Sequence, residues 1–434
     1  MSRLGKRTAP RTRPDRRLVL TGGAVLAALL ILGGVLIALL PPRPTPTTSV
    51  AELPVGFSCA RVPEGLTLGV IVSLSSAPGE GSEWKDAANG AVVAARRFAM
   101  GGCTVRVVAA DDHGTADGAR AAVEELAGEQ VSGLVIATDG SHTSAAVDAA
   151  RASGIAALLP YGGDAASAGD GAWLTAPDAA RIDAALVEAA GAGSRTLLVD
   201  AGGTAPQAVA PEATLVFAPG GSTADLVDAA RPYLSGERPV DRVLVSGPAE
   251  TQAIAVAALQ AAGTATPILL TPDAQSPPFA SALVDAGGTL SGDLTTAGVD
   301  SGDAVALRGD EAGRAMSAYL AALRVTADDS TQTALLGDRP FRDVSAVADT
   351  PSHDAVVALV RAAAAAGRRD PSAVRAALSG SVVSPADGLA GPRLDFSAPT
   401  ALGASVLALH ATPQDLGLRP TTVPLLWFAG QPRP

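Results

Sequence analysis

Short apolar runs rich in β-branched residues alternate along this chain with longer segments that have helical periodicity. In the first half, strands are predicted over residues 67–73, 104–110, 133–138 and 155–159, and helices over residues 86–100, 117–129 and 144–153. Strands connected through helices form right-handed crossovers and lie parallel in one sheet. The alternation therefore predicts an α/β fold with a Rossmann-like, parallel sheet.

The same alternation begins again in the second half of the chain. Strands are predicted over residues 195–200, 213–217, 240–246 and 267–270, and helices over residues 178–192, 223–233, 249–262 and 280–286. Two successive sheets of this kind predict two Rossmann-like lobes of similar build. Further helices are predicted at 311–325, 352–366 and 372–379, and a terminal hairpin at 389–410.

A membrane segment is predicted before the first lobe. Residues 18–40 carry no charge, and 23 residues in a helix reach roughly 34 Å, enough to cross a bilayer core. Residues 1–17 hold seven basic groups and one acid, which predicts a cytoplasmic tail and an extracellular body. A Pro-rich linker follows at residues 41–59. The segment is expected to be a single transmembrane helix or uncleaved signal anchor.

A cleaved export signal is the alternative for this segment. Ser49-Val50-Ala51 is a weak small-x-small cleavage site, and Arg16-Arg17 resembles a twin-arginine signal. The protein would then be secreted. In both cases the body lies outside the cytoplasm, either tethered to the cell membrane or released.

Charge and composition exclude several classes of function. The first 17 residues hold seven of the 32 basic groups and one of the 43 acidic groups, so the remainder carries a net charge of −17. Such a body disfavours nucleic-acid binding, which needs a basic face. Two cysteines are too few for a disulfide scaffold or a closed thiolate zinc site.

The sequence shows no recognisable catalytic, metal-binding or cofactor-binding motif. It lacks HExxH, GxxxxGK[ST] and GxSxG patterns, and its four histidines are scattered. Asp111, Asp112 and His113 are interpreted as a strand end with capping acids rather than a metal site. His142 has only Asp139 nearby as an orienting acid, so no nucleophilic catalysis is predicted. We expect no enzyme activity, no metal and no cofactor.

Several small signals, taken in order, resemble a known family. Asn89-Gly90 opens a helix that ends in Gly-Gly, a strand ends in Asp111-Asp112, and a Ser/Thr loop precedes the helix at 144–153. Later, His353-Asp354-Ala355 begins a helix, and a G…G…F segment ends at Phe396. Over roughly residues 64–410 the chain resembles type I solute-binding proteins, the branched-chain amino-acid-binding class of ABC importers. It departs from them after Asp200, where the usual helix and aromatic residue are missing.

The resemblance implies two lobes that close on a solute by hinge motion. The chain would cross between the lobes near residues 174–177, 290–296 and 387–392. The first lobe would comprise residues 60–174 plus 297–387, and the second residues 175–296 plus 388–434. The ligand would lie in the cleft beyond the carboxyl ends of the strands.

Two loops of the first lobe are candidates for binding a ligand carboxylate. Ser141, Thr143 and Ser144 precede a helix, whose free N–H groups and dipole favour an anion. Tyr161-Gly162-Gly163-Asp164 follows a strand, and its glycines allow close approach to backbone N–H groups. Ordinary N-capping and an ordinary βα turn are the alternatives. Relatives carry a hydroxyl residue near Asp164, so an acid there would instead attract a cation.

The remaining candidates surround the expected cleft. Asp273 follows a strand where amino-acid-binding relatives place the acid that pairs with the α-ammonium group, although a helix cap is the alternative. Ser75, Ser76 and Trp84 lie in the loop after the first strand and could cover the ligand, although a loop Trp is often a packing anchor. Asp200 and Ser246 each follow a second-lobe strand.

Cys59 and Cys103 are expected to form a disulfide. Each precedes a strand, and in the strand order that the resemblance implies these strands are parallel neighbours. The expected compartment is oxidising. The alternative is two free, buried thiols.

We therefore predict an extracytoplasmic protein that binds a small polar, amino-acid-like solute for an ABC permease. The alternative is a membrane-anchored module that senses its ligand or has lost it. An enzyme on the same fold is a third reading, for which the sequence offers no catalytic constellation.

Overall fold

The computed structural model describes residues 54–162, 168–290, 292–413, 415–420 and 427–430. By its internal contacts the chain divides into Met1–Glu52 and Leu53–Pro434, and the description below concerns the second unit. The predicted tail and membrane segment, residues 1–17 and 18–40, lie outside the described residues. Within the described ranges, no helix is long and apolar enough to cross a membrane.

The first sheet has five parallel strands in the order β2-β1-β3-β4-β5. These are β1 (Leu66–Val72), β2 (Val105–Asp111), β3 (Leu134–Ile136), β4 (Ala157–Leu159) and β5 (Ala172–Leu174). Every residue of the interior strand β1 is buried, as expected for a strand covered on both faces. The strand order reverses between β1 and β3, and ligands of open α/β sheets bind beyond such a point.

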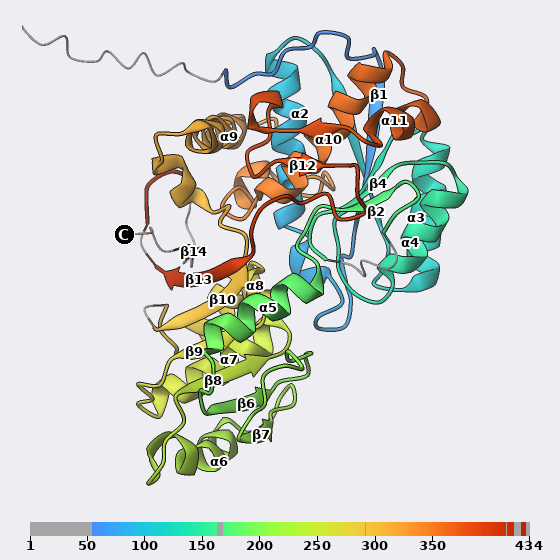
Figure 1. The fold of residues 1–434 in the computed structure, drawn as a ribbon. Helices are drawn as coiled ribbons and strands as arrows, with labels where there is room; N and C mark the ends of the chain where they lie inside the picture. Colours follow the sequence, from blue (N-terminus) through green and yellow to red (C-terminus); the bar gives the residue numbers. More distant parts are fainter. Residues whose placement is uncertain (1–53, 163–167, 291, 414, 421–426, 431–434) are drawn as a thin grey trace, which may run out of the picture. The chain divides into compact units, whose positions relative to one another are not determined.

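Helices cover both faces of the first sheet (Figure 1). On one face α2 (Gly90–Met100), α10 (Thr350–Ala366) and α11 (Pro371–Leu378) bury Phe98 and Leu359. On the other face α3 (Ala116–Gly128) and α4 (Thr143–Ala152) bury Leu126 and Val147. A further helix, α9 (Glu311–Asp328), packs against α2 through Tyr319 and Leu323.

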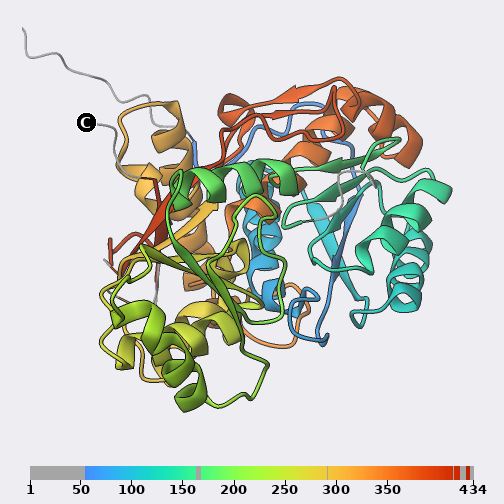
Figure 2. The same cartoon turned by 60° about the horizontal axis from the view of Figure 1, so that its bottom comes forward.

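The second sheet has seven strands in the order β14-β13-β10-β9-β8-β6-β7. Five are parallel: β6 (Thr196–Asp200), β7 (Ala213–Val216), β8 (Arg242–Ser246), β9 (Ile268–Leu270) and β10 (Leu294–Gly298). The antiparallel strands β13 (Leu407–Thr412) and β14 (Trp427–Ala429) extend it beyond β10. Helices α6 (Thr223–Ser235), α7 (Ala249–Ala261) and α8 (Pro278–Asp285) cover one face, and α5 (Ala179–Ala190) covers the other (Figure 2).

The C-terminal part differs from the predicted hairpin at residues 389–410. Strand β12 (Leu394–Asp395) pairs with β11 (Val382–Val383), whereas β13 pairs with β10 and β14. Residues 388–402, assigned from sequence to the second lobe, contribute Leu389, Phe396 and Leu402 to the core of the first sheet. Apolar alternation identified the extended segments, but it carries no information on which distant strand each one joins.

Cys59 and Cys103 are joined by a disulfide, with their Cα atoms 5.7 Å apart. Cys59 lies in the segment before β1, and Cys103 immediately precedes β2. The bond therefore fastens the start of the body to the edge of its first sheet, and the alternative of two free thiols does not hold.

Candidate ligand-binding cavity

A cavity of about 1360 Å³ is lined by loops from both sheets. The first sheet contributes residues that follow β1, β3 and β4, including Trp84, Asp139 and Tyr161. The second contributes the short 3-10 helix Pro272–Gln275 after β9 and the start of α8. The cavity thus lies at the carboxyl ends of parallel strands, where α/β folds bind small molecules.

Four of the predicted ligand residues line this cavity: Trp84, Tyr161, Gly162 and Asp273. The rings of Trp84 and Tyr161 stack, with their centroids 4.5 Å apart and their planes inclined by 11°. The stacked pair presents aromatic surface to the cavity, a surface that packs apolar groups and attracts cations.

Three predicted hydroxyl residues satisfy their hydrogen bonds within the protein instead. Thr143 Oγ1 donates to the carbonyl oxygen of Gly140 at 2.9 Å, and Ser144 Oγ donates to that of Ser141 at 3.1 Å. Ser76 Oγ accepts from the backbone N–H of Ser82 at 3.1 Å. None of the three side chains lines the cavity.

The remaining predicted residues lie apart from the cavity or outside the described chain. Ser75 is exposed beside the turn at Gly114. Asp200, at the end of β6, accepts from the N–H of Gly202, and Ser246 is buried at the end of β8. Gly163 and Asp164 belong to residues 163–167, outside the described residues.

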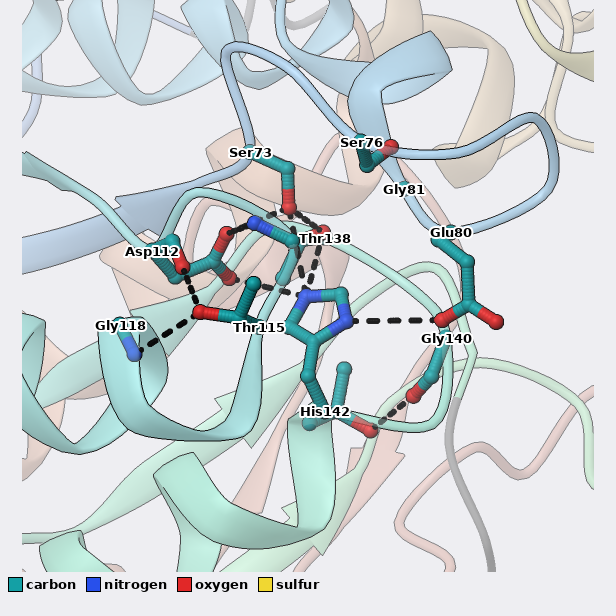
Figure 3. Close-up of polar contacts among 12 residues, drawn as sticks. Ser73, Ser76, Glu80, Gly81, Asp112, Thr115, Gly118, Thr138, Gly140 and His142 are labelled. Atoms are coloured by element: carbon teal, nitrogen blue, oxygen red, sulfur yellow. Dashed lines mark hydrogen bonds and ion pairs between the residues drawn. The ribbon is translucent and has the colours of Figure 1, made fainter.

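Glu80 occupies the N-terminus of α4, where the sequence predicted a ligand carboxylate. Its Oε2 accepts from the backbone N–H of Ser141 at 2.9 Å and from Ser141 Oγ at 3.2 Å. His142 Nδ1 lies 3.6 Å from the same oxygen (Figure 3). Gly140, with φ of 114°, makes room, because a Cβ there would lie 2.4 Å from Glu80 Oε2. The protein thus supplies its own carboxylate to this anion site.

His142 also anchors a buried polar network beneath this loop (Figure 3). Its Nε2 lies 3.0 Å from Asp112 Oδ2, and Ser73 Oγ donates to Asp112 Oδ1 at 2.6 Å. The hydrogen bond to Asp112 raises the pKa of His142 despite burial. Burial opposes ionisation of Asp112, but hydrogen bonds from His142 and Ser73 outweigh it and lower the pKa of that carboxyl.

This Ser-His-Asp grouping does not have the geometry of a nucleophilic triad. In a triad, the acid and the nucleophile bind opposite ring nitrogens of the histidine. Here Asp112 and Ser73 both face Nε2, at 3.0 and 3.3 Å, and all three side chains are buried. The network instead holds the ends of β1 and β2 and the start of α4 together.

Asp139 and Asp273 bring carboxylates from the two sheets to one cavity. Burial raises the pKa of Asp139. Burial also raises the pKa of Asp273 to about 6, and the negative charges of Asp139 and Glu83 add to the rise. Among the described residues, no lysine, arginine or histidine lies within ion-pair distance of either carboxylate. Both groups are therefore costly to ionise while the cavity holds only water.

The cavity lining is strongly acidic overall. Its charged members are two arginines, Arg342 and Arg419, and nine aspartates: Asp86, Asp139, Asp183, Asp273, Asp303, Asp328, Asp343, Asp349 and Asp354. Asp303 is compensated by Arg419, whose guanidinium donates to both carboxylate oxygens at 2.7 and 2.6 Å. Asp349 caps α10, and burial raises its pKa to about 7.

Asp139, in the cavity lining, and Glu80, which lies beside it against Gly140, are the residues whose roles were missed in the sequence. The sequence does contain one signal for Glu80, because this residue lies between two glycines, which is typical of a tight turn. In the structure both glycines adopt positive φ, 80° at Gly79 and 99° at Gly81. A Cβ on Gly81 would lie 2.0 Å from Thr138 Oγ1, so this turn packs directly against the end of β3. Across the described ranges, no cluster of three or more side chains has the arrangement of a metal site.

The comparisons with known proteins place this architecture among solute-binding folds. A type 1 periplasmic binding protein from Bordetella pertussis superposes with a TM-score of 0.58 at 14% identity, covering 84% of this chain and 99% of that one. The chain has the fold of type I periplasmic binding proteins. A leucine-binding protein from Thermotoga maritima matches equally well, with a TM-score of 0.58, 14% identity, and 84% and 98% of the two chains covered.

A third structure is a branched-chain amino-acid transporter substrate-binding protein from Streptococcus pneumoniae in complex with isoleucine. It has a TM-score of 0.57 and 15% identity, with 80% of this chain and 95% of that one covered. No protein-family model matches the sequence, and no curated protein matches it. At such low identity the likeness establishes the fold, and the ligand must be inferred from the cavity itself.

Proposed function

We propose that this protein is an extracytoplasmic solute-binding protein that captures a small polar ligand between two lobes and delivers it to an ABC permease. One observation carries the proposal. A cavity lined by loops of both sheets brings Asp139 and Asp273 together, and among the described residues no lysine, arginine or histidine lies within ion-pair distance of either carboxylate. A solute with a positively charged nitrogen would supply that partner.

The structural neighbours support a binding role. Besides the protein that holds isoleucine, a solute-binding protein from R. palustris in complex with 4-hydroxybenzoate has the same fold, with a TM-score of 0.56 and 16% identity. The fold therefore accommodates chemically different solutes. Ligand binding would shift the population from open to closed lobes. We propose no catalytic step.

The uncharged segment 18–40 supports an anchored protein. In this proposal it tethers the body to the outer face of the cell membrane, with residues 1–17 in the cytoplasm. The two lobes would comprise residues 60–174 plus 297–387 and residues 175–296 plus 388–434. The exception is residues 388–402, which join the first lobe because they contribute to the core of the first sheet.

A sensing role without transport is the second candidate. The chain runs from β6 to β7 through residues 201–212 without a helix, where the resemblance to transport proteins predicts one. Calorimetric titration of the full-length chain with amino acids, amines and aromatic acids tests binding. Uptake of the bound solute is then measured in cells that lack the protein. Uptake is lost if the protein delivers the solute to a permease, and it is unchanged if the protein only senses the solute.

A further inference from the structure

We infer that the solute is a small organic cation without a carboxylate group, such as an amine or a quaternary ammonium compound. The inference deepens the proposed function and rests on it. It arises from two features: the anion-binding positions in and beside the cavity are taken up by the protein's own carboxylates, and the two cavity carboxylates Asp139 and Asp273 have no cation within ion-pair distance among the described residues.

The first anion-binding position is the N-terminus of α4, which Glu80 fills. A ligand carboxylate there would compete with Oε2 for the N–H and hydroxyl of Ser141. It would also face the carboxylates of Glu80 and Asp139, and the imidazole of His142 already lies 3.6 Å from Glu80 Oε2. Like charges at such short range disfavour the anion strongly.

The second anion-binding position, the turn at Gly162, is filled by Asp139. A Cβ on Gly162 would lie 2.3 Å from Asp139 Oδ2, so the Asp139 carboxylate packs directly on this backbone. Asp139 Oδ1 also accepts from the N–H of Gly140 at 2.7 Å. The N-terminus of α4 and the backbone at Gly162, the described part of the second predicted loop, are thus both contacted by carboxylates of the protein itself.

Neither arginine of the cavity lining provides another place for a ligand carboxylate to bind. Arg419 is buried, and it is bound to Asp303 and to the carbonyl oxygens of Ala346 and Ala348. Arg342 lies at an exposed edge of the lining and is followed by Asp343. An exposed charge in high dielectric contributes little to holding an anion.

The same cavity is well suited to a cation. Asp139 reaches it from the end of β3 and Asp273 from the end of β9, so one cation contacts an acid from each sheet. The stacked rings of Trp84 and Tyr161 line the same space, and aromatic faces attract amines and quaternary ammonium groups. Closure on such a ligand would relieve the repulsion between Asp139 and Asp273.

Titration of the full-length chain with spermidine, choline, L-leucine, L-glutamine and benzoate tests the inference. We expect spermidine or choline to bind, and the three carboxylates to bind at least about tenfold more weakly or not at all. Asp139→Asn and Asp273→Asn, which keep the side-chain shape, should each weaken cation binding by about tenfold or more. Asp285→Asn, an exposed acid of α8 outside the cavity lining, is the matched control and should leave the affinity unchanged.

Two other outcomes distinguish failure of the inference from failure of the proposed function. Binding of L-leucine or benzoate as tightly as the cations overturns the inference and leaves the proposed solute-binding function standing. Absence of binding by all five probes, in protein whose circular dichroism confirms folding, overturns the inference and the proposed function together.

Discussion

The Glu80 carboxylate accepts two hydrogen bonds from Ser141, one from its backbone N–H at 2.9 Å and one from its hydroxyl at 3.2 Å. The two residues are 61 positions apart in the sequence, and the contact joins the loop after β1 to the start of α4. It converts the helix N-terminus, a favourable place for an anion, into a satisfied internal contact. The contact lies beside the cavity, whose lining includes the neighbouring Gly140.

Replacing Glu80 should open the anion site. In Glu80→Ala, the freed N–H and hydroxyl of Ser141 become available, so affinity for L-leucine should rise about tenfold or more, as expected for a charge-assisted hydrogen bond. Calorimetric titration checks the change. Glu237→Ala is the control, because Glu237 is an exposed acid that follows helix α6. Unchanged L-leucine affinity in Glu80→Ala would show that Glu80 does not block the site.

Cation binding should weaken in acid. Burial raises the pKa of Asp273 to about 6, so this carboxylate loses its charge as the pH falls from 8 to 5. Choline keeps its charge at every pH, and its affinity should fall about tenfold between pH 8 and pH 5. Asp273→Asn should lose most of this dependence. A wild-type affinity that stays constant from pH 8 to pH 5 would contradict the assignment of Asp273 to the cation site.

The Asp273 carboxylate should lower the stability of the ligand-free protein at high pH. Because burial raises the folded-state pKa of Asp273 from its ordinary value of 3.8 to about 6, the folded state binds the proton more tightly than the unfolded state. Its contribution to stability is therefore greatest below pH 4 and is lost as the pH rises through 6.

Asp273→Asn, which cannot ionise, should accordingly unfold at a higher temperature than wild type at pH 8. The gain should be about 1 kcal/mol, after discounting for solvent screening, or a few degrees. At pH 4.5 the difference should shrink. Differential scanning calorimetry measures both, with Asp285→Asn as the control. A lower melting temperature for Asp273→Asn at pH 8 would mean that the carboxylate is compensated in the free protein.

Removing the disulfide should destabilise the body. The bond closes a loop with a sequence separation of 44, for which loop-closure entropy gives about 4 kcal/mol. The double variant Cys59→Ser, Cys103→Ser should therefore lose about 2–4 kcal/mol in guanidinium unfolding. Reduced wild-type protein is the matched comparison and should behave like the variant. Equal stability of oxidised and reduced wild type would refute the prediction.

Local patterns were sufficient to predict the alternating elements but not the site. The cap of α3 is local in this way: Thr115 Oγ1 accepts from the N–H of Gly118 at 3.0 Å, and N-capping depends on residues three apart. The role of Glu80 depends instead on a turn folding onto the end of β3, and that approach involves residues far apart in the chain. The pairing of β13 with β10 is non-local in the same way.

The polar residues of the candidate site illustrate the same limit. Ser, Thr and Asp after a strand are expected both at ligand sites and at ordinary caps. In the folded chain Thr143 and Ser144 bond to carbonyls of their own turn, whereas Trp84 and Asp273 reach the cavity. Residue type alone could not separate these outcomes, since both satisfy the same local hydrogen-bonding rules.

A crystal structure of the full-length chain grown with spermidine tests the central claim most directly. We predict a nitrogen of the ligand within about 3.2 Å of carboxylate oxygens of both Asp139 and Asp273, with its chain against Trp84. Density for the ligand elsewhere on the protein, with these two carboxylates facing only water, would contradict the account.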